Sequence, residues 1–290
     1  MESYEREALE AVTTRPAHPY RTLTVDRITP VLGAEVSGVD LSQEIPAEQL
    51  EEIRAAFRDY HVLVFRDQTI TTEHHKRFAA AFGELRPVNP LPPEGDPYIL
   101  EIRTTSAAAD VAGNGWHADG TADAEPSLGS MLYITEIPEP GCGGDTLFAN
   151  MHLAYDMLSP AMRALLDPLT AIHDGAQALA GYTPPADYVI PKSEHPLVAR
   201  HPETDRRLLY VNKAYTSRIP QLSTDESRAL LDVLFDIIAR RPVLHCRVRW
   251  TPGTLVFWDN RCVQHHATYD YYPYARYGQR VAINGGPVKG

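Results

Sequence analysis

The prediction of the fold rests on two stretches of sequence, Trp116-His117-Ala118-Asp119 and Phe257-Trp258-Asp259-Asn260-Arg261-Cys262-Val263-Gln264-His265-His266. In an extended segment, residues i and i+2 project from the same face, so His117 and Asp119 can direct an imidazole nitrogen and a carboxylate oxygen at one point. Both stretches lie beside apolar runs that are typical of buried strands, at residues 128–134 and 254–258. We therefore expect a fold whose strands bring the two stretches together.

A second histidine from the later stretch would complete a set of two imidazoles and one carboxylate around a metal ion. That ligand set, with its other positions open, is diagnostic of non-haem Fe(II) oxygenases. His265 and His266 are both candidates, and they point to opposite faces of an extended segment, so only one of them can reach the metal. Arg280 lies in another strand-like run, where its guanidinium could hold a carboxylate in a bidentate pair.

The composition is that of an ordinary soluble globular chain of 290 residues, 43% hydrophobic and 22% charged. At this length we expect a flexible arm at residues 1–20 and a single catalytic domain at residues 21–290. The formal net charge is −11 and the sequence has no cluster of Lys and Arg, which argues against a nucleic-acid surface. The expected partner is a small-molecule substrate.

The cysteines and the lack of long apolar runs indicate a cytoplasmic protein. Cys142, Cys246 and Cys262 are too few and too scattered for a disulfide framework or a cysteine-based zinc site. We interpret Cys262, beside the candidate site, as a small buried hydrophobe and not as a nucleophile, because it has no assigned cationic partner. No apolar run reaches membrane-spanning length, and the charged N-terminus lacks the apolar core of a signal peptide.

Many short strands with a few helices predict a mainly β fold with flanking helices, a double-stranded β-helix (jelly roll, cupin-like) and not a βαβ fold. Strands are expected at residues 23–25, 33–41, 61–65, 128–134, 145–148, 207–211, 245–250, 254–258 and 279–283. Helices are expected after Pro46, at residues 72–82, after Ser159-Pro160 and behind the capping box at residues 223–226.

Two parts of this pattern have alternative interpretations. Residues 175–205 contain many prolines and no clear period, which predicts either a flap over the site or a passive surface excursion. His74 and His75 are adjacent on a predicted helix. A solvated helix face is expected for them in place of a metal site, because adjacent residues on a helix seldom face the same way.

Further motifs follow one another along the chain: Leu32-Gly33-Ala34-Glu35-Val36-Ser37-Gly38-Val39-Asp40-Leu41, Phe65-Arg66-Asp67-Gln68, Phe82-Gly83-Glu84-Leu85, Trp116-His117-Ala118-Asp119, Gly143-Gly144-Asp145-Thr146-Leu147, His201-Pro202-Glu203-Thr204 and Trp258-Asp259-Asn260-Arg261. Each motif is modest by itself, whereas their order is highly specific. Over residues 23–283 the chain resembles the taurine dioxygenase-like family of Fe(II)/2-oxoglutarate-dependent dioxygenases.

The resemblance implies that His117, Asp119 and His265 are the catalytic metal ligands, because the family has a Gln before the second histidine and an Ala two residues after it. It implies that Arg280 binds the distal carboxylate of 2-oxoglutarate and that Thr146 adds a hydroxyl hydrogen bond to this cosubstrate. Trp116 and Trp258 flank the ligands and either wall the pocket or belong to the core, and Trp258 is counted as a candidate for cofactor binding. The implied cofactors are Fe(II), 2-oxoglutarate and O2.

The implied reaction hydroxylates a C–H bond of a small organic substrate and releases succinate and CO2. Related halogenases lack the carboxylate that Asp119 supplies, so its presence favours hydroxylation or desaturation. The alternatives are a desaturase or rearrangement oxygenase with the same iron chemistry, a zinc hydrolase with the same ligands, or a non-enzymatic metal-binding or sugar-binding jelly roll. We also expect a homo-oligomer, a dimer or a tetramer.

The substrate site departs from the family pattern. Taurine-specific members hold the sulfonate with an Arg four residues past the cosubstrate Arg, where this chain has Asn284, and with a His where it has Val88. A sulfonate would lose its charged clamp, so we predict that taurine is not the substrate. Gly120 and Ala122 suggest a roomier, more apolar pocket. The candidate substrate contacts are Val88, Asn114, Gly120, Tyr215 and Asn284.

The segment from Tyr269 to Tyr277 is rich in tyrosine and is interpreted as a few residues longer than its family counterpart. It is either an aromatic lid over a bulky substrate or a turn packed by its tyrosines, because tyrosine suits half-buried surfaces in general.

Overall fold

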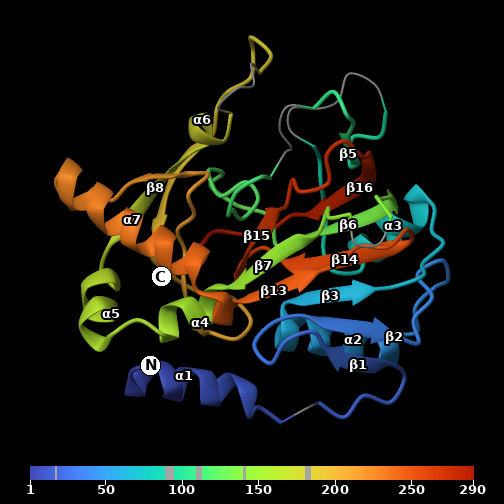
Figure 1. Cartoon of the computed structure of the whole chain (residues 1–290), viewed down its shortest axis with the longest axis horizontal. Helices are drawn as coiled ribbons and strands as arrows, with labels where there is room; N and C mark the ends of the chain where they lie inside the picture. The colour runs from blue at the N-terminus through green and yellow to red at the C-terminus, as the bar shows by residue number, and fades with distance from the viewer. Residues whose placement is uncertain (17, 89–94, 109–112, 140–141, 180–183) are drawn as a thin grey trace.

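A large mixed sheet crosses the middle of the molecule (Figure 1). The computed structural model describes residues 1–16, 18–88, 95–108, 113–139, 142–179 and 184–290. The main sheet has the spatial order β1 (Thr24–Arg27), β2 (Ala34–Ser37), β3 (Val62–Phe65), β14 (Thr254–Asp259), β6 (Gly129–Glu136), β16 (Arg276–Ile283) and β4 (Leu85–Arg86), and β5 (Leu100–Thr104) also pairs with β16. β2 and β3 pair in parallel, whereas β6 pairs antiparallel with β14 on one side and with β16 on the other.

A smaller sheet shares an apolar layer with the main sheet and carries part of the later stretch. Its order is β13 (His245–Val248), β7 (Thr146–Asn150) and β15 (Val263–Ala267). Phe148 of β7 packs on Trp258 of β14, with ring centroids 5.8 Å apart. The remaining strands form two small sheets. One has the order β12 (Thr216–Arg218), β8 (Thr170–Asp174) and β9 (Lys192–Pro196), and the other pairs β10 (Val198–Arg200) with β11 (Arg207–Leu209). The predicted mainly β architecture is therefore present.

Side chains of the central strands alternate between two apolar clusters. Val62 and Val64 of β3 belong to the layer between the sheets, whereas Leu63 and Phe65 face the opposite side. Helices α2 (Ala47–Tyr60) and α3 (Thr72–Ala80) cover that opposite side, where their apolar residues join the same cluster. Because both faces of β3 are covered, every position of the strand is apolar.

The other helices lie around the smaller sheets. They are α1 (Ser3–Thr13), α4 (Met151–Asp156), α5 (Pro160–Leu166), α6 (Gly175–Ala178), α7 (Thr224–Arg240) and the 3-10 helix η1 (Pro242–Leu244). Figure 1 shows α4, α5 and α7 on the side of the molecule away from α3. The predicted capping box of α7 is confirmed, since Ser223 Oγ accepts from the Glu226 N–H and the Glu226 carboxylate accepts from the Ser223 N–H.

Helix α1 corrects the expectation of a flexible arm at residues 1–20. The helix packs against α4 and buries Val12. Its Glu5 carboxylate lies 2.7 Å from a guanidinium nitrogen of Arg241. Ala8 and Leu9 complete a short apolar stripe with Val12. Three small or medium apolar residues over little more than one turn give too weak a period for the sequence to predict the helix.

The predictions for residues 175–205 and for the adjacent histidines His74 and His75 also need revision. Residues 180–183 of that stretch lie outside the described residues, but β9 pairs with β8 and His195 is buried, so much of the stretch belongs to the folded core. His75 is buried and packs edge-on against Tyr133, which contradicts the expected solvated face. The neighbouring His74 instead completes the capping box of α3.

Candidate active site

His117 and His265 are joined through their backbones. The His117 N–H donates to the His265 carbonyl at 3.0 Å, and the His265 N–H donates to the His117 carbonyl at 2.8 Å. The chain at His117 thus adds an isolated antiparallel bridge to the edge of β15. β15 itself is placed by β7, where His265 pairs with Phe148. As a result, the two imidazole centroids are 4.1 Å apart.

Asp119 is held by hydrogen bonds to both its backbone and its carboxylate. The Asn260 side chain accepts the Asp119 N–H at 2.7 Å and donates to the Asp119 carbonyl at 2.9 Å. The same amide nitrogen donates to the Ser127 carbonyl and hydroxyl at 3.2 and 3.0 Å. Ser130 donates its hydroxyl to Asp119 Oδ2 at 3.0 Å. Asn260 directly follows β14, so the end of a central strand fixes the loop that carries the carboxylate.

His117, Asp119 and His265 form a compact group of potential metal ligands, in which one atom of each lies within 4.8 Å of the others. His117 Nε2 is 3.7 Å and His265 Nε2 is 3.8 Å from Asp119 Oδ1. Metal–ligand bonds of about 2.0–2.2 Å place neighbouring ligand atoms roughly 3 Å apart. The group therefore fits a metal ion after a small contraction.

The charge state of the group favours a cation. Burial alone would raise the pKa of Asp119, but the positive charge of Arg280 holds it well below its usual range. Burial, together with His117, lowers the pKa of His265 well below its usual value, so this imidazole is neutral. The His117 Nδ1–H donates to the Gly115 carbonyl at 2.8 Å, which leaves the Nε2 lone pair facing Asp119.

The rival histidine, His266, points to the other face of β15. Its Nε2 lies 3.2 Å from Asn114 Oδ1, and its ring packs edge-on against Trp116. Trp258, in contrast, packs against His265 with ring centroids 4.8 Å apart. The structure thus brings His265 and Trp258 to the ligand group and places His266, Asn114 and Trp116 together elsewhere.

Two arginines of β16 point to the same face of the strand, because Arg276 and Arg280 are four residues apart. A guanidinium nitrogen of Arg280 lies 2.7 Å from Asp119 Oδ1, directly at the ligand group. Arg276 is buried, and among the described residues its Nε and one Nη have no hydrogen-bond partner. Burial lowers its pKa. The sequence interpretation overlooked Arg276, although its even spacing from Arg280 is a signal that could have found it.

Arg276 lies close to Thr146 through a shared neighbour. Its guanidinium is 5.4 Å from the ring centroid of Trp250. The Trp250 indole N–H donates to the Thr146 hydroxyl at 3.0 Å. Thr146 is the first residue of β7 and is buried. These three residues form a polar group with a net positive charge at the start of β16, four residues before Arg280.

Apart from Asn114, the candidate substrate residues are divided between two places. Tyr215 lies near Asp119 and against the Gly120 backbone, and burial raises its pKa to about 12. Gly120 has φ 60°, and a Cβ there would lie 2.8 Å from Asp123 Oδ2, so only glycine fits without strain. Val88 follows β4, and the Asn284 N–H donates to the Glu84 carbonyl at 2.8 Å, so both residues lie beside β4 at the end of β16 away from Arg276.

Of the tyrosines at residues 269–277, Tyr271 is buried, whereas Tyr272 and Tyr274 are exposed. The Tyr269 hydroxyl donates to the Ala108 carbonyl at 2.7 Å, and the Tyr277 hydroxyl donates to Glu101 at 2.9 Å. These contacts tie the segment to neighbouring parts of the chain, as expected for a turn packed by its tyrosines.

Two sheets that gather two histidines and one aspartate have the arrangement of the mononuclear non-haem iron oxygenases. Residues 24–282 match the family model described as "Taurine catabolism dioxygenase TauD, TfdA family", and the chain belongs to this family. It is 34% identical over 269 residues to an alpha-ketoglutarate-dependent dioxygenase of Penicillium expansum, covering 87% of this chain and 74% of the relative.

Two further relatives support this membership. The chain is 32% identical over 279 residues to an alpha-ketoglutarate-dependent sulfate ester dioxygenase of Pseudomonas putida, covering 91% of this chain and 90% of the relative. The crystal structure of a taurine dioxygenase from Burkholderia xenovorans superposes with a TM-score of 0.81 at 34% identity, covering 93% of each chain. The predicted jelly roll is therefore confirmed.

The protein is a non-haem dioxygenase that depends on Fe(II), 2-oxoglutarate and O2 and oxidises a small organic substrate. The alternatives of a zinc hydrolase and of a non-enzymatic jelly roll are set aside by this membership. Within the described ranges, no helix combines the length and the apolar character needed to cross a bilayer.

Proposed function

We propose that His117, Asp119 and His265 bind the catalytic iron, that Arg276 and Thr146 bind the distal carboxylate of 2-oxoglutarate, and that Arg280 binds an anionic group of the substrate. When bound, the iron and 2-oxoglutarate would supply the oxidising chemistry together with O2, which converts the keto acid to succinate and CO2 and hydroxylates a substrate C–H bond. The protein's own residues supply the placement of both molecules.

The observation that carries this proposal is the buried guanidinium of Arg276, whose Nε and one Nη lack a hydrogen-bond partner among the described residues. Buried charged nitrogens without partners are unfavourable, so this side chain is explained by an anion that is present during function. A carboxylate matches the planar guanidinium in a bidentate pair. The Thr146 hydroxyl accepts from Trp250, so it keeps its own proton to donate to such a carboxylate.

This assignment revises the role expected for Arg280. Arg280 contacts Asp119, so it lies beside the metal ligands, whereas the distal carboxylate is the end of 2-oxoglutarate that does not chelate the metal. Arg276 and Arg280 are four residue steps apart in the strand, which is about 13 Å of extended backbone. Arg276 therefore suits the distal carboxylate better. With Arg276 in this role, the segment at residues 269–277 need not be longer than its family counterpart.

The revision also changes the argument about the substrate. With Arg276 as the cosubstrate residue, the position four residues further on is Arg280 and not Asn284, so the chain keeps a cationic residue for an anion. We propose an organic anion other than taurine, such as a sulfate ester, a sulfonate or a carboxylate. The similarity to a sulfate ester dioxygenase supports an anionic substrate, and the apolar Val88 and the small Gly120 suit a molecule without the ammonium group of taurine.

The test is an anaerobic titration with Fe(II) and 2-oxoglutarate, followed by the weak visible charge-transfer band of the complex. Loss of charged hydrogen bonds worth about 1.5–3 kcal/mol predicts that Arg276→Ala weakens 2-oxoglutarate binding by roughly 10- to 150-fold. Arg280→Ala should bind 2-oxoglutarate within a few-fold of the wild type. With hexyl sulfate as the anionic probe substrate, it should release less succinate than the wild type. Fe(II) affinity is measured separately for both variants, because Arg280 contacts Asp119.

The opposite pattern would restore the original assignment: weak 2-oxoglutarate binding in Arg280→Ala and normal binding in Arg276→Ala. A Thr146→Val variant is the conservative companion, since it keeps the shape of the side chain and removes the hydroxyl. It should weaken 2-oxoglutarate binding less than Arg276→Ala does.

We also propose that the enzyme acts in the cytoplasm as a homo-dimer or homo-tetramer. All three cysteines are free thiols, which suits a reducing compartment. Light scattering of the purified enzyme tests the oligomeric state.

A further inference from the structure

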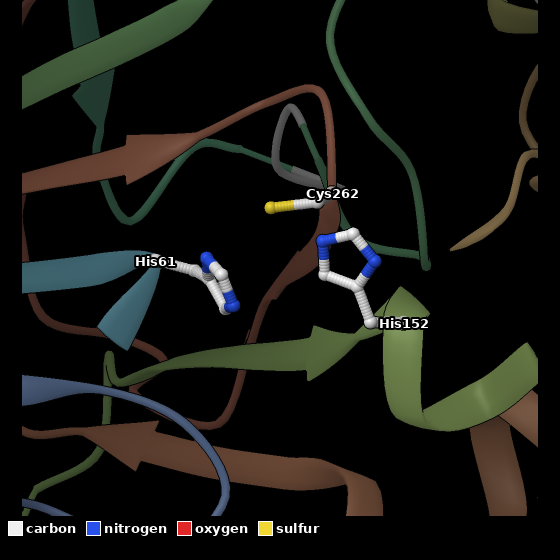
Figure 2. A group of neighbouring side chains, drawn as sticks. All are labelled: His61, His152 and Cys262. Atoms are coloured by element: carbon white, nitrogen blue, oxygen red, sulfur yellow. The ribbon is translucent and has the colours of Figure 1, made fainter. Parts of the chain in front are cut away.

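A second group of potential metal ligands lies apart from the proposed iron ligands. His61, His152 and Cys262 each offer one ligand atom, and these atoms lie within 4.8 Å of one another. Figure 2 shows the three side chains converging on one place. The two imidazole rings are tilted relative to each other, with centroids 5.3 Å apart. All three residues are buried, with at most 3% of their surface exposed.

The three residues come from separate elements. His61 is the C-cap of α2 and precedes β3. His152 lies in α4, and Cys262 lies in the turn between β14 and β15. One bound ion would therefore connect the helix on one side of the main sheet, a helix beside the smaller sheet, and the turn that leads to His265.

His152 is oriented as a metal ligand. Its Nδ1–H donates to the Arg207 carbonyl at 2.8 Å, which fixes the tautomer and leaves a lone pair on Nε2. That Nε2 is buried, and no described residue offers it a hydrogen-bond partner. Histidine ligands of metals usually donate their second ring N–H to a backbone carbonyl in this way. Burial lowers the pKa of His152 to about 3, so the ring is neutral and the lone pair is available.

His61 presents a second unsatisfied nitrogen. Its Nδ1 is buried and lacks a hydrogen-bond partner among the described residues. Burial and the nearby His152 lower the pKa of His61 well below its usual value, so both imidazoles are neutral. The backbone of His61 has φ 63°, in the left-handed region that favours glycine. A histidine at such a position needs a compensating interaction, and its side chain points into this group.

Cys262 supplies a sulfur ligand and lies between two groups. Its Sγ is within reach both of His61 and His152 and of the pair His201 and Asp259. Asp259 is already satisfied, because it accepts from His201 at 3.0 Å and from the Arg261 side chain at 2.8 and 2.7 Å. The ligand atoms that remain for an ion are therefore the sulfur and the two imidazole nitrogens.

We propose that His61, His152 and Cys262 bind a thiophilic metal ion, zinc(II) or copper(I), at a structural site separate from the iron. Thiolate ligands select these softer ions, whereas imidazole and carboxylate ligands suit Fe(II). Binding forms one metal–sulfur and two metal–nitrogen bonds and breaks the S–H bond, so one proton is released to solvent. The ion gives each unsatisfied nitrogen a partner.

This site differs from the kind that the sequence argued against. Three scattered cysteines exclude a zinc site built from several cysteines, but one cysteine with two histidines needs no second thiol. The surrounding charges are the Asp259–Arg261 pair, Arg206 and Glu203. A thiolate with copper(I) is neutral in this environment, and with zinc(II) it carries one positive charge beside Asp259.

The test begins with the metal content of the full-length enzyme, measured by mass spectrometry after loading with zinc(II) or with copper(I) in separate arms. In one of the two arms we expect about one zinc or copper ion per chain in addition to iron. The arm in which it is found identifies the ion. Cobalt(II), which replaces zinc, should give a near-ultraviolet thiolate-to-cobalt band when it binds Cys262. The iron ligands include no sulfur, so cobalt at the iron site cannot give this band.

Matched variants localise the ion. Cys262→Ala should lose the additional ion and, in the zinc arm, the cobalt band. Cys246→Ala should keep both, because it removes an equally buried thiol that belongs to no ligand group of the described residues. His61→Gly is the companion variant if Cys262→Ala fails to fold, since glycine tolerates the left-handed backbone. An ion retained by Cys262→Ala or His61→Gly, or none bound by the wild type in either arm, overturns the proposal.

Discussion

Asn260 holds the loop of Asp119 through several hydrogen bonds. Its amide makes hydrogen bonds to the backbone of Asp119 and to Ser127, and the side chain is 2% exposed. None of these bonds involves the Asp119 carboxylate. Asn260 is therefore a positioning residue, which acts on the proposed iron site through the backbone of another residue.

Substitution Asn260→Ala should weaken Fe(II) binding and lower stability together. Removal of the amide leaves a buried N–H and carbonyl unpaired, at a cost of about 1–3 kcal/mol each. Loss of an outer partner of a metal ligand typically reduces metal affinity 10- to 100-fold. Anaerobic Fe(II) titration and thermal unfolding measure the two effects.

Asn150→Ala is the matched control. This buried asparagine donates to the Val31 carbonyl at 2.8 Å and caps α4 through Leu153, and neither hydrogen bond involves a proposed iron ligand. It should lose comparable stability and keep normal Fe(II) affinity. Equal Fe(II) affinity in Asn260→Ala and the wild type would show that Asn260 serves stability alone.

Among single residues, the sequence indicates the metal-ligand candidates better than the contacts that position them. His117, Asp119 and His265 could be proposed from sequence because spacing and a family motif point to them. Arg276 was missed because both arginines of β16 have the right charge, and only burial distinguishes them. Asn260 belongs to the motif Trp258-Asp259-Asn260-Arg261, but the Asp119 backbone groups that it bonds lie 141 residues away in the chain, and no local pattern reveals them.

Among the elements, α7 is the one whose start is best specified by sequence. The Ser223 and Glu226 side chains satisfy each other's backbone N–H groups. Ser223→Ala should destabilise the protein by about 1 kcal/mol, because a helix N-cap is lost. In a chain of this size that corresponds to a decrease of about 2 °C in Tm. Glu226→Gln keeps both hydrogen bonds and should change Tm less. A Tm of Ser223→Ala equal to that of the wild type would contradict the role of the cap.

Element predictability followed the strength of the local signals. α2, α3 and α7 have apolar stripes or capping residues, and β3, β6 and β14 are long apolar runs, so all were predicted. α1 and β9 were not, since α1 buries only Val12 completely and β9 is Lys192-Ser193-Glu194-His195-Pro196, largely polar. Their structure is imposed by tertiary contacts, with α4 for α1 and with β8 for β9.

The molecule as a whole buries several histidines in the neutral state. Burial lowers the pKa of His75 to about 4 and of His173 to about 3. In the unfolded chain these rings titrate near pH 6.5. Between these values the unfolded chain binds more protons than the folded one, so stability is complete above pH 6.5 and is lost as the pH falls. Each such histidine contributes a slope of up to about 1.4 kcal/mol per pH unit.

A His75→Leu variant should therefore flatten the acid limb of the stability profile. Urea unfolding at pH 8, 6 and 5 should show that the free energy of unfolding decreases less steeply in the variant, by up to about 1.4 kcal/mol per pH unit. The comparison at pH 8, where the ring is neutral in both states, isolates the effect of packing. Parallel profiles for the two proteins at all three pH values would contradict a neutral buried His75.

The reciprocal backbone bonds between His117 and His265, with the Asn260 clamp on Asp119, have a consequence for evolution and engineering. The main chain, and not the ligand side chains, fixes where three positions meet. Those side chains can be exchanged while the meeting point stays in place, so a new donor atom at position 117, 119 or 265 would inherit a prepared geometry. The backbone can therefore hold a different set of metal ligands at these positions without a change of fold.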